Sequence, residues 1–202
     1  MFRRFLYGVA VVMALAVVWQ GWTIYRAWHY LDNESAAQSY GAAPDKAKVT
    51  IIAFVDYSSR PSKDVNGMVM SVVLENPDTR IIFHPIPAKT KVGMRATAIA
   101  LAAALQNKFV PMHEELMRSE GVFSDEDIRA MAERIKADPD KLLKDAKSDV
   151  VIQHLYRELA AEKRIGVNMT PIFYFNRKTL FGPSSYDTLH DDFTAEIKKA
   201  RN

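Results

Sequence analysis

Two serines three residues apart are the first candidates for chemistry in this 202-residue chain. Ser59 and Ser62 flank Arg60 and Pro61 in the stretch FVDYSSRPSK, where an apolar run ends and a helical pattern begins. A hydroxyl at the start of a helix can bind an anion or, with a base beside it, act as a nucleophile. It can also cap the helix by accepting a hydrogen bond from a backbone N–H group. No histidine lies close to either serine in the sequence, so we favour the capping role.

Other residue types that carry chemistry are missing or scattered. The chain has no cysteine, which excludes disulfides, thiolate metal sites and cysteine nucleophiles. The five histidines are His29, His84, His113, His154 and His190. Because they show no metal-ligand spacing, we expect structural roles for them, at the surface or half-buried, with no metal and no cofactor. The net charge of +3 is small and no basic stretch is interleaved with aromatic residues, which argues against a nucleic-acid partner.

The N-terminal residues predict a membrane anchor. Arg3 and Arg4 precede an uncharged, mostly apolar run from Phe5 to Tyr25. About 20 such residues are enough for a helix to cross the hydrocarbon layer. Tryptophans and tyrosines gather at the far end of the run, as in an interfacial belt, and the arginines before it place the N-terminus on the cytoplasmic side. A cleaved signal peptide is the alternative, which the length of the run and the lack of a nearby small-residue cleavage site disfavour.

The composition divides the chain into three regions. Residues 1–28 form the predicted transmembrane helix. Residues 29–47, which are mostly small and polar and include a proline, are expected to be a flexible linker. Residues 48–202 carry the strand and helix patterns of one folded domain.

Within that domain the predicted order is β-α-β, a block of helices, and then β-β-α. The apolar run at 49–57, the helical pattern at 62–75 and the run at 79–87 predict two parallel strands joined by a crossover helix. A hairpin, with its turn at Arg177–Lys178, and an amphipathic helix end the chain. The order indicates one sheet interrupted by a helical insertion at about 88–166, an α/β fold.

Four segments in this order resemble the DsbA-like branch of the thioredoxin superfamily. They are VTIIAFVDYSSRPSK, TRIIFHPIP, RATAIALAAALQNKFVPMHEELM and RIGVNMTPIFYFNRKTLFG. The resemblance implies a thioredoxin fold with an inserted helical domain, here preceded by the transmembrane helix. It also implies a cis-proline at Thr170–Pro171 and an exported location. Together with the predicted anchor, this location leads us to expect a single-pass inner-membrane protein whose folded domain lies in the periplasm.

The chain departs from that family where the redox chemistry would be. Ser59 and Ser62 stand at the positions of the C-x-x-C cysteines, whose first member acts as a low-pKa thiolate. A serine hydroxyl cannot carry out dithiol exchange. Ala53 stands where the family commonly has a buried acid. Replacement of the cysteines in the laboratory would not usually remove that acid as well, so Ala53 favours natural loss of the redox site.

We therefore expect a non-redox protein-binding or chaperone-like module. The resemblance places its contacts with extended segments of exported or envelope proteins at Tyr57, Ser59, Ser62, Thr170 and Pro171. Pro171 could instead serve only to shape the edge of the sheet. The main alternative is a thiol-disulfide oxidoreductase whose parent carries C-R-P-C at 59–62. A third possibility is a structural subunit of an envelope complex, docked through the anchor and the insertion.

Overall fold

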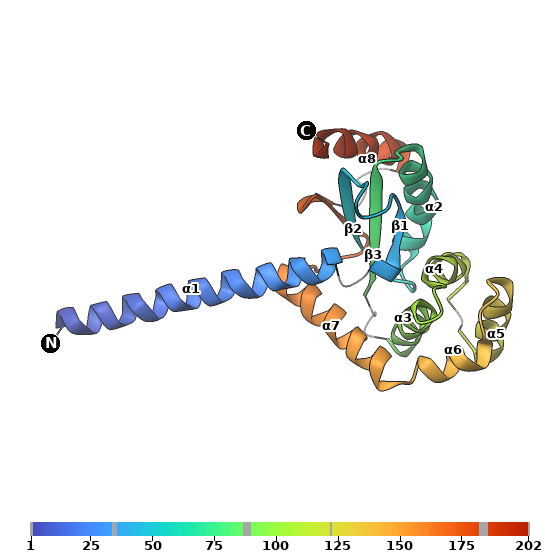
Figure 1. Ribbon diagram of the computed structural model, residues 1–202, viewed down its shortest axis with the longest axis horizontal. Coiled ribbons are helices and arrows are strands. Elements are labelled where there is room, and N and C mark those ends of the chain that lie inside the picture. The colour runs from blue at the N-terminus through green and yellow to red at the C-terminus, as the bar shows by residue number, and fades with distance from the viewer. Residues whose placement is uncertain (1, 34–35, 87–89, 122, 182–185, 202) are drawn as a thin grey trace.

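The computed structural model describes residues 2–33, 36–86, 90–121, 123–181 and 186–201 (Figure 1). The elements in chain order are α1 (Phe2–Asn33), η1 (Ala36–Gln38), β1 (Ser39–Gly41), β2 (Val49–Val55), α2 (Arg60–Glu75), β3 (Thr79–Pro85), α3 (Lys91–Ala104), α4 (Phe109–Arg118), α5 (Asp125–Arg134), α6 (Pro139–Asp145), α7 (Asp149–Ile165), β4 (Ile172–Phe175), β5 (Lys178–Phe181) and α8 (Tyr186–Ala200).

The strands form one mixed sheet in the order β1-β3-β2-β4-β5. The central strands β2 and β3 are parallel, as predicted, and α2 is the crossover helix between them. The other three pairings are antiparallel. The hairpin turn lies at Asn176 and Arg177, one residue earlier than expected, because both residues adopt the positive φ angles that a tight two-residue hairpin requires.

Side chains of β2 alternate between two apolar layers, because successive residues of a strand point to opposite faces. Ile51, Ala53 and Val55 belong to the larger core, to which α2, α8 and the helical insertion contribute. Ile52 and Phe54 belong to a smaller core on the other face, formed with α1 and α7. The helices α3–α7 lie between β3 and β4 in the sequence, which confirms the predicted thioredoxin fold with a helical insertion.

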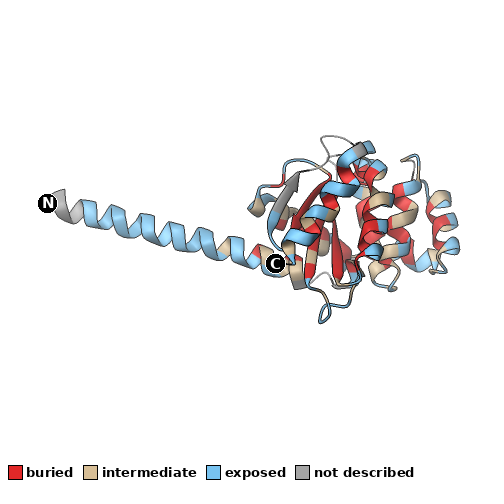
Figure 2. Ribbon diagram, turned by 90° about the horizontal axis from the view of Figure 1, so that it is seen from above, coloured by how far each residue is buried: buried red, intermediate tan, exposed pale blue. Residues whose placement is uncertain are grey.

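The helix α1 projects away from the domain and is exposed along most of its length (Figures 1 and 2). Its stretch Leu6–Asp32 is the one part of the described chain that is long and apolar enough to cross a membrane. The last turns differ, since Ala27 and Leu31 are buried against the sheet. The end of the apolar helix is therefore fixed to the folded domain.

The prediction of a flexible linker at 29–47 is wrong for the part of that segment that the structure describes. Residues Ser39–Gly41 form β1, an edge strand antiparallel to β3. The side chain of Gln38 is buried and donates a hydrogen bond of 2.7 Å to the Phe83 carbonyl. The composition of the segment is polar, but its backbone and one amide side chain find partners on β3, and these contacts override the tendency of such residues to form a coil.

Candidate functional site

The turn between β2 and α2 holds Ser59 at the N-cap position, with extended backbone angles. The Ser59 side chain makes no capping hydrogen bond, so the expected capping role is wrong for this residue. The carboxylate of Asp56 accepts the hydrogen bonds in this turn instead. Asp56 Oδ1 accepts bonds from the backbone N–H and the hydroxyl of Ser58, both at 2.7 Å.

Ser62 lies in the first turn of the helix and is fully buried. Its hydroxyl accepts a hydrogen bond from the Asp56 backbone N–H at 3.3 Å, which ties the end of β2 to the first turn of α2. Ala53 is buried in the same core. Across the described residues, no hydrogen bond joins the hydroxyl of Ser59 or Ser62 to a histidine or a carboxylate. Neither serine thus has the base that a nucleophile needs.

Tyr57 follows β2 and points into the core rather than toward the surface. Its hydroxyl lies 3.1 Å from His113 Nδ1, and His113 Nε2 lies 2.8 Å from Asn66 Oδ1. Burial lowers the pKa of His113 to about 3 and raises the pKa of Tyr57 well above its usual value. His113 is therefore a neutral, fully buried residue, which corrects the expected surface or half-buried position.

The peptide bond between Thr170 and Pro171 is cis, as the resemblance predicts. Pro171 directly precedes β4, and the pairing of Phe54 with Ile172 brings this loop to the end of β2 from which the serine turn departs. Among the described residues, the backbone groups of Asn168–Thr170 take no part in backbone hydrogen bonds. The side chain of Met169 is 50% exposed. A loop segment without backbone hydrogen bonds therefore lies at the same edge of the sheet as the serine turn.

A hollow of about 370 Å³ lies beside the serine turn, between the first turn of α2 and the end of α4. It is lined by Ser58, Arg60, Lys63, Asp64, Met117, Arg118, Ser119 and Glu120. Most of these residues are charged or polar, and Lys63 spans the hollow by donating a hydrogen bond of 2.6 Å to the Ser119 carbonyl. Arg60, one of the predicted site residues, is exposed at its rim.

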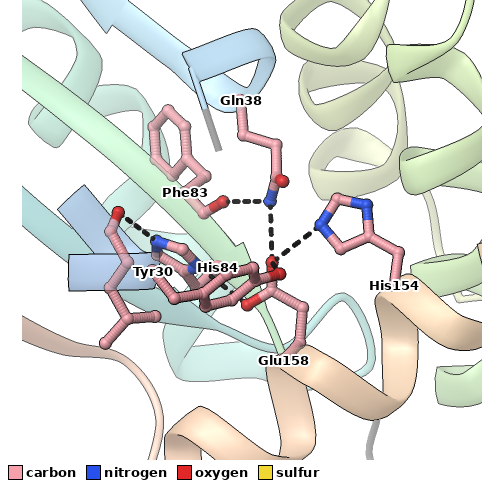
Figure 3. A network of polar contacts seen from close by, with 7 residues as sticks. Tyr30, Gln38, Phe83, His84, His154 and Glu158 are labelled. Atoms are coloured by element: carbon pink, nitrogen blue, oxygen red, sulfur yellow. Dashed lines mark hydrogen bonds and ion pairs between the residues drawn. The ribbon is translucent and has the colours of Figure 1, made fainter. Parts of the chain in front are cut away.

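A second polar cluster joins α1, η1, β3 and α7, and no sequence argument found it (Figure 3). At its centre is the buried carboxylate of Glu158. Oε2 lies 2.7 Å from His84 Nδ1, and Oε1 accepts hydrogen bonds from Tyr30, Gln38 and His154. His84 is buried, not at the surface or half-buried as expected.

Both ring nitrogens of His84 face acceptors, because Nε2 lies 3.1 Å from the Leu31 carbonyl. The imidazolium form satisfies both acceptors. Burial alone would raise the pKa of Glu158, but the charge of His84 and the bonds from both histidines outweigh it and lower that pKa to about 2. The network is therefore a buried ion pair that holds the end of α1 to β3 and α7.

One signal in the sequence could have revealed Glu158. It falls on the buried stripe of α7, at helical spacing from Val151, Leu155 and Ala161. A lone carboxylate on an apolar stripe needs a partner in the core. In the part of the chain that the structure describes, no three histidine, aspartate or glutamate side chains converge as metal ligands do, and the expectation of no metal and no cofactor stays a prediction.

The curated relatives that match this chain are sodium/proton antiporters. They are NhaA of Herminiimonas arsenicoxydans, 24% identical over 199 residues, and NhaA 3 of Salinispora tropica, 22% identical over 160 residues. The matches cover 92% and 78% of this chain but only 31% and 24% of the antiporters. The chain thus spans about a quarter to a third of the length of these relatives, and the likeness does not transfer their activity.

Solved structures and a family model match the folded domain. A periplasmic thioredoxin-like protein from Salmonella enterica serovar Typhimurium is 25% identical, with a TM-score of 0.73 over 88% of this chain and 95% of that one. A thioredoxin-like oxidoreductase from Silicibacter pomeroyi DSS-3 is 24% identical, with a TM-score of 0.74 over 85% and 95%. The model of the DSBA-like thioredoxin domain matches residues 50–194. With this match over most of its length, the chain belongs to the family of DSBA-like thioredoxin domains, as a member without cysteine.

Proposed function

We propose that this chain is a membrane-anchored, non-redox DsbA-like protein that binds extended segments of exported proteins. The observation that carries the proposal is the unpaired backbone of Asn168–Thr170, which lies beside the cis-proline and at the same sheet edge as the serine turn. An extended peptide can pair with free backbone groups in this way, and an exposed apolar side chain such as Met169 adds contact area.

The serine turn supports a role without redox chemistry. Ser62 is committed to the Asp56 backbone, and Ser59 has no base to activate it. Ala53 puts an apolar side chain at the position in the core where the family commonly has an acid. What remains at this edge is a binding surface, formed by the turn, the loop before β4 and the polar hollow between α2 and α4.

The anchor supports a location at the inner membrane, with the domain in the periplasm. The apolar stretch of α1 is exposed, and arginines precede it at positions 3 and 4. Positive charge before a first apolar helix favours retention of the N-terminus in the cytoplasm. The burial of Ala27 and Leu31 supports a position of the folded domain directly at the outer surface of that membrane.

The test uses the full chain in lipid nanodiscs and a permanently unfolded probe, reduced and carboxymethylated α-lactalbumin carrying a fluorophore. We expect saturable binding, which Met169→Asp weakens about tenfold, since loss of a central contact costs more than about 1 kcal/mol. Leu105→Asp is the matched control, because Leu105 is 47% exposed but lies at the end of α3. Equal affinity of the wild type and both variants would refute a binding surface at the cis-proline loop.

The same preparation tests the alternative of an oxidoreductase. We expect no reduction of insulin above the buffer rate, because the chain contains no thiol. Cysteine codons at positions 59 and 62 of the source gene would show that the serines were introduced, and would overturn the proposal of a natural non-redox protein.

A further inference from the structure

A cavity of about 680 Å³ lies between the outer half of α1 and the last turns of α7. On α1 it is lined by Trp19, Trp22, Tyr25 and Arg26, among others, and on α7 by Arg157 and Arg164. Trp22 and Tyr25 stack with their ring centroids 5.8 Å apart, which gives the cavity an aromatic wall. The serine turn and the cis-proline loop contribute no residue to this cavity.

The charge of the cavity is of one sign. Three arginines line it, and none of the described residues on its surface is acidic. Arg26 and Arg164 are both exposed, so their guanidinium groups can reach a ligand from two different helices. A guanidinium group binds the oxygens of a phosphate through paired hydrogen bonds, which a lysine cannot reproduce.

The position of the cavity along α1 agrees with the level of lipid head groups. The uncharged part of the helix ends at Tyr25, and its roughly 20 residues rise about 30 Å, the thickness of the hydrocarbon layer. At this depth Arg26 lies at the level of the lipid phosphate groups, and Trp19 and Trp22 lie in the interfacial aromatic belt. Ala27 and Ala161 belong to one apolar cluster, and Tyr30 donates a hydrogen bond to Glu158. These interactions hold α7 against this part of α1.

From this placement we propose that the cavity is a binding site for the head group of an anionic phospholipid. The phosphate lies between Arg26 and Arg164, and the glycerol and upper acyl carbons lie against Trp19 and Trp22. The inference rests on the membrane anchor in the proposed function. If the site is occupied, the bound lipid contacts both α1 and α7. The lipid would therefore help to fix the orientation of the folded domain relative to the membrane.

Fluorescence quenching by brominated lipids tests the site in the full chain. The chain has three tryptophans, and a Trp28→Phe background leaves only the two that line the cavity. The protein is reconstituted in nanodiscs of phosphatidylcholine that contain a small fraction of either brominated phosphatidylglycerol or brominated phosphatidylcholine. Arg26 and Arg164, the two arginines proposed to contact the phosphate, should each strengthen association about fivefold, so we expect phosphatidylglycerol to be preferred by about 25-fold.

The double variant Arg26→Gln, Arg164→Gln should lose this preference. Lys163→Gln is the matched control, because it removes a charge from the adjacent residue of α7, which does not line the cavity. We expect it to change the preference by less than about twofold. Arg164→Gln alone should lower the preference about fivefold. A loss in Lys163→Gln as large as in this single variant would show that diffuse surface charge attracts the lipid, and would overturn the site.

Two further outcomes separate the site from the anchor. Equal quenching by the two brominated lipids overturns the site but leaves the anchor intact. Quenching by neither lipid shows that α1 does not enter the bilayer, and it overturns the anchor together with the site. Displacement of phosphatidylglycerol by inorganic phosphate would mean that the cavity binds free phosphate, and it would overturn the assignment to a lipid.

Discussion

Replacement of Glu158 by glutamine should destabilise the folded domain by about 3 kcal/mol at neutral pH. The substitution keeps the size of the side chain and its ability to form hydrogen bonds, but it removes the negative charge. His84 Nδ1, 2.7 Å from the carboxylate in the wild type, would then lose its ionic partner inside the core. His154 would lose the same partner at 3.2 Å.

Two independent arguments lead to this magnitude. The pKa of Glu158 falls from 4.5 to about 2 in the folded chain. Since one pKa unit corresponds to about 1.4 kcal/mol, the charged form is stabilised by about 3 kcal/mol relative to the unfolded chain. Removal of one partner from a buried ion pair costs about 3–5 kcal/mol in other proteins, because the remaining charge stays buried.

The pH dependence gives a sharper test than the stability at one pH. Because the folded pKa of Glu158 is below its unfolded value, its contribution is complete above about pH 5 and is lost as the pH falls toward 2. The wild type should therefore lose about 3 kcal/mol over this range that Glu158→Gln does not lose. The gap between the two proteins should close in acid.

Urea unfolding of the full chain in detergent micelles measures this gap. Trp28 reports the transition, because its ring packs edge-on against Tyr174 with centroids 5.1 Å apart. Glu133→Gln, an exposed position on α5, is the control and should change the free energy of unfolding by less than about 0.5 kcal/mol. A loss below about 1 kcal/mol in Glu158→Gln, or a gap that stays constant into acid, would refute the buried ion pair.

Two further predictions concern the turn and the tyrosine that follows β2. Ser62→Ala should lower the free energy of unfolding by about 1 kcal/mol, because the Asp56 N–H loses its acceptor, whereas Ser59→Ala should be nearly neutral. Urea titrations of both variants check this, and a larger loss at Ser59 would restore the capping role. Tyr57→Phe should cost about 2 kcal/mol, since it leaves Nδ1 of the neutral His113 ring without a partner in the core. The same titration measures it, and a loss below about 0.5 kcal/mol would contradict that bond.

Local patterns account for most of the fold that could be predicted. The runs at 49–55 and 79–85 are strands because β-branched and apolar residues dominate both, as in strands buried on both faces. Gly166 ends α7 in the left-handed conformation, and Ser124, Asp138 and Ser148 cap the helices that follow them. Each of these features depends on only a few consecutive residues, so it can be predicted from the local sequence.

The missed features depend on residues far apart in the sequence. β1 was hidden because a three-residue edge strand among small polar residues forms only where β3 offers its backbone. Ser59 occupies the N-cap position, but its side chain makes no capping hydrogen bond. In this turn the Asp56 carboxylate accepts the hydrogen bond from the Ser58 N–H group. The candidate surface at the cis-proline loop was placed through the family resemblance, and its binding role stays a prediction.

The sequence by itself determined three things about this protein: an apolar helix ahead of a folded domain, the order of strands and helices from β2 onward, and the absence of any thiol for redox chemistry. These follow from composition and short-range periodicity. Only the tertiary structure decided that Glu158 is a buried ion and that Arg164 meets Arg26 across a cavity. The physical reason is that charge and burial depend on which distant segments pack together, and α1 and α7 come together only when the domain folds.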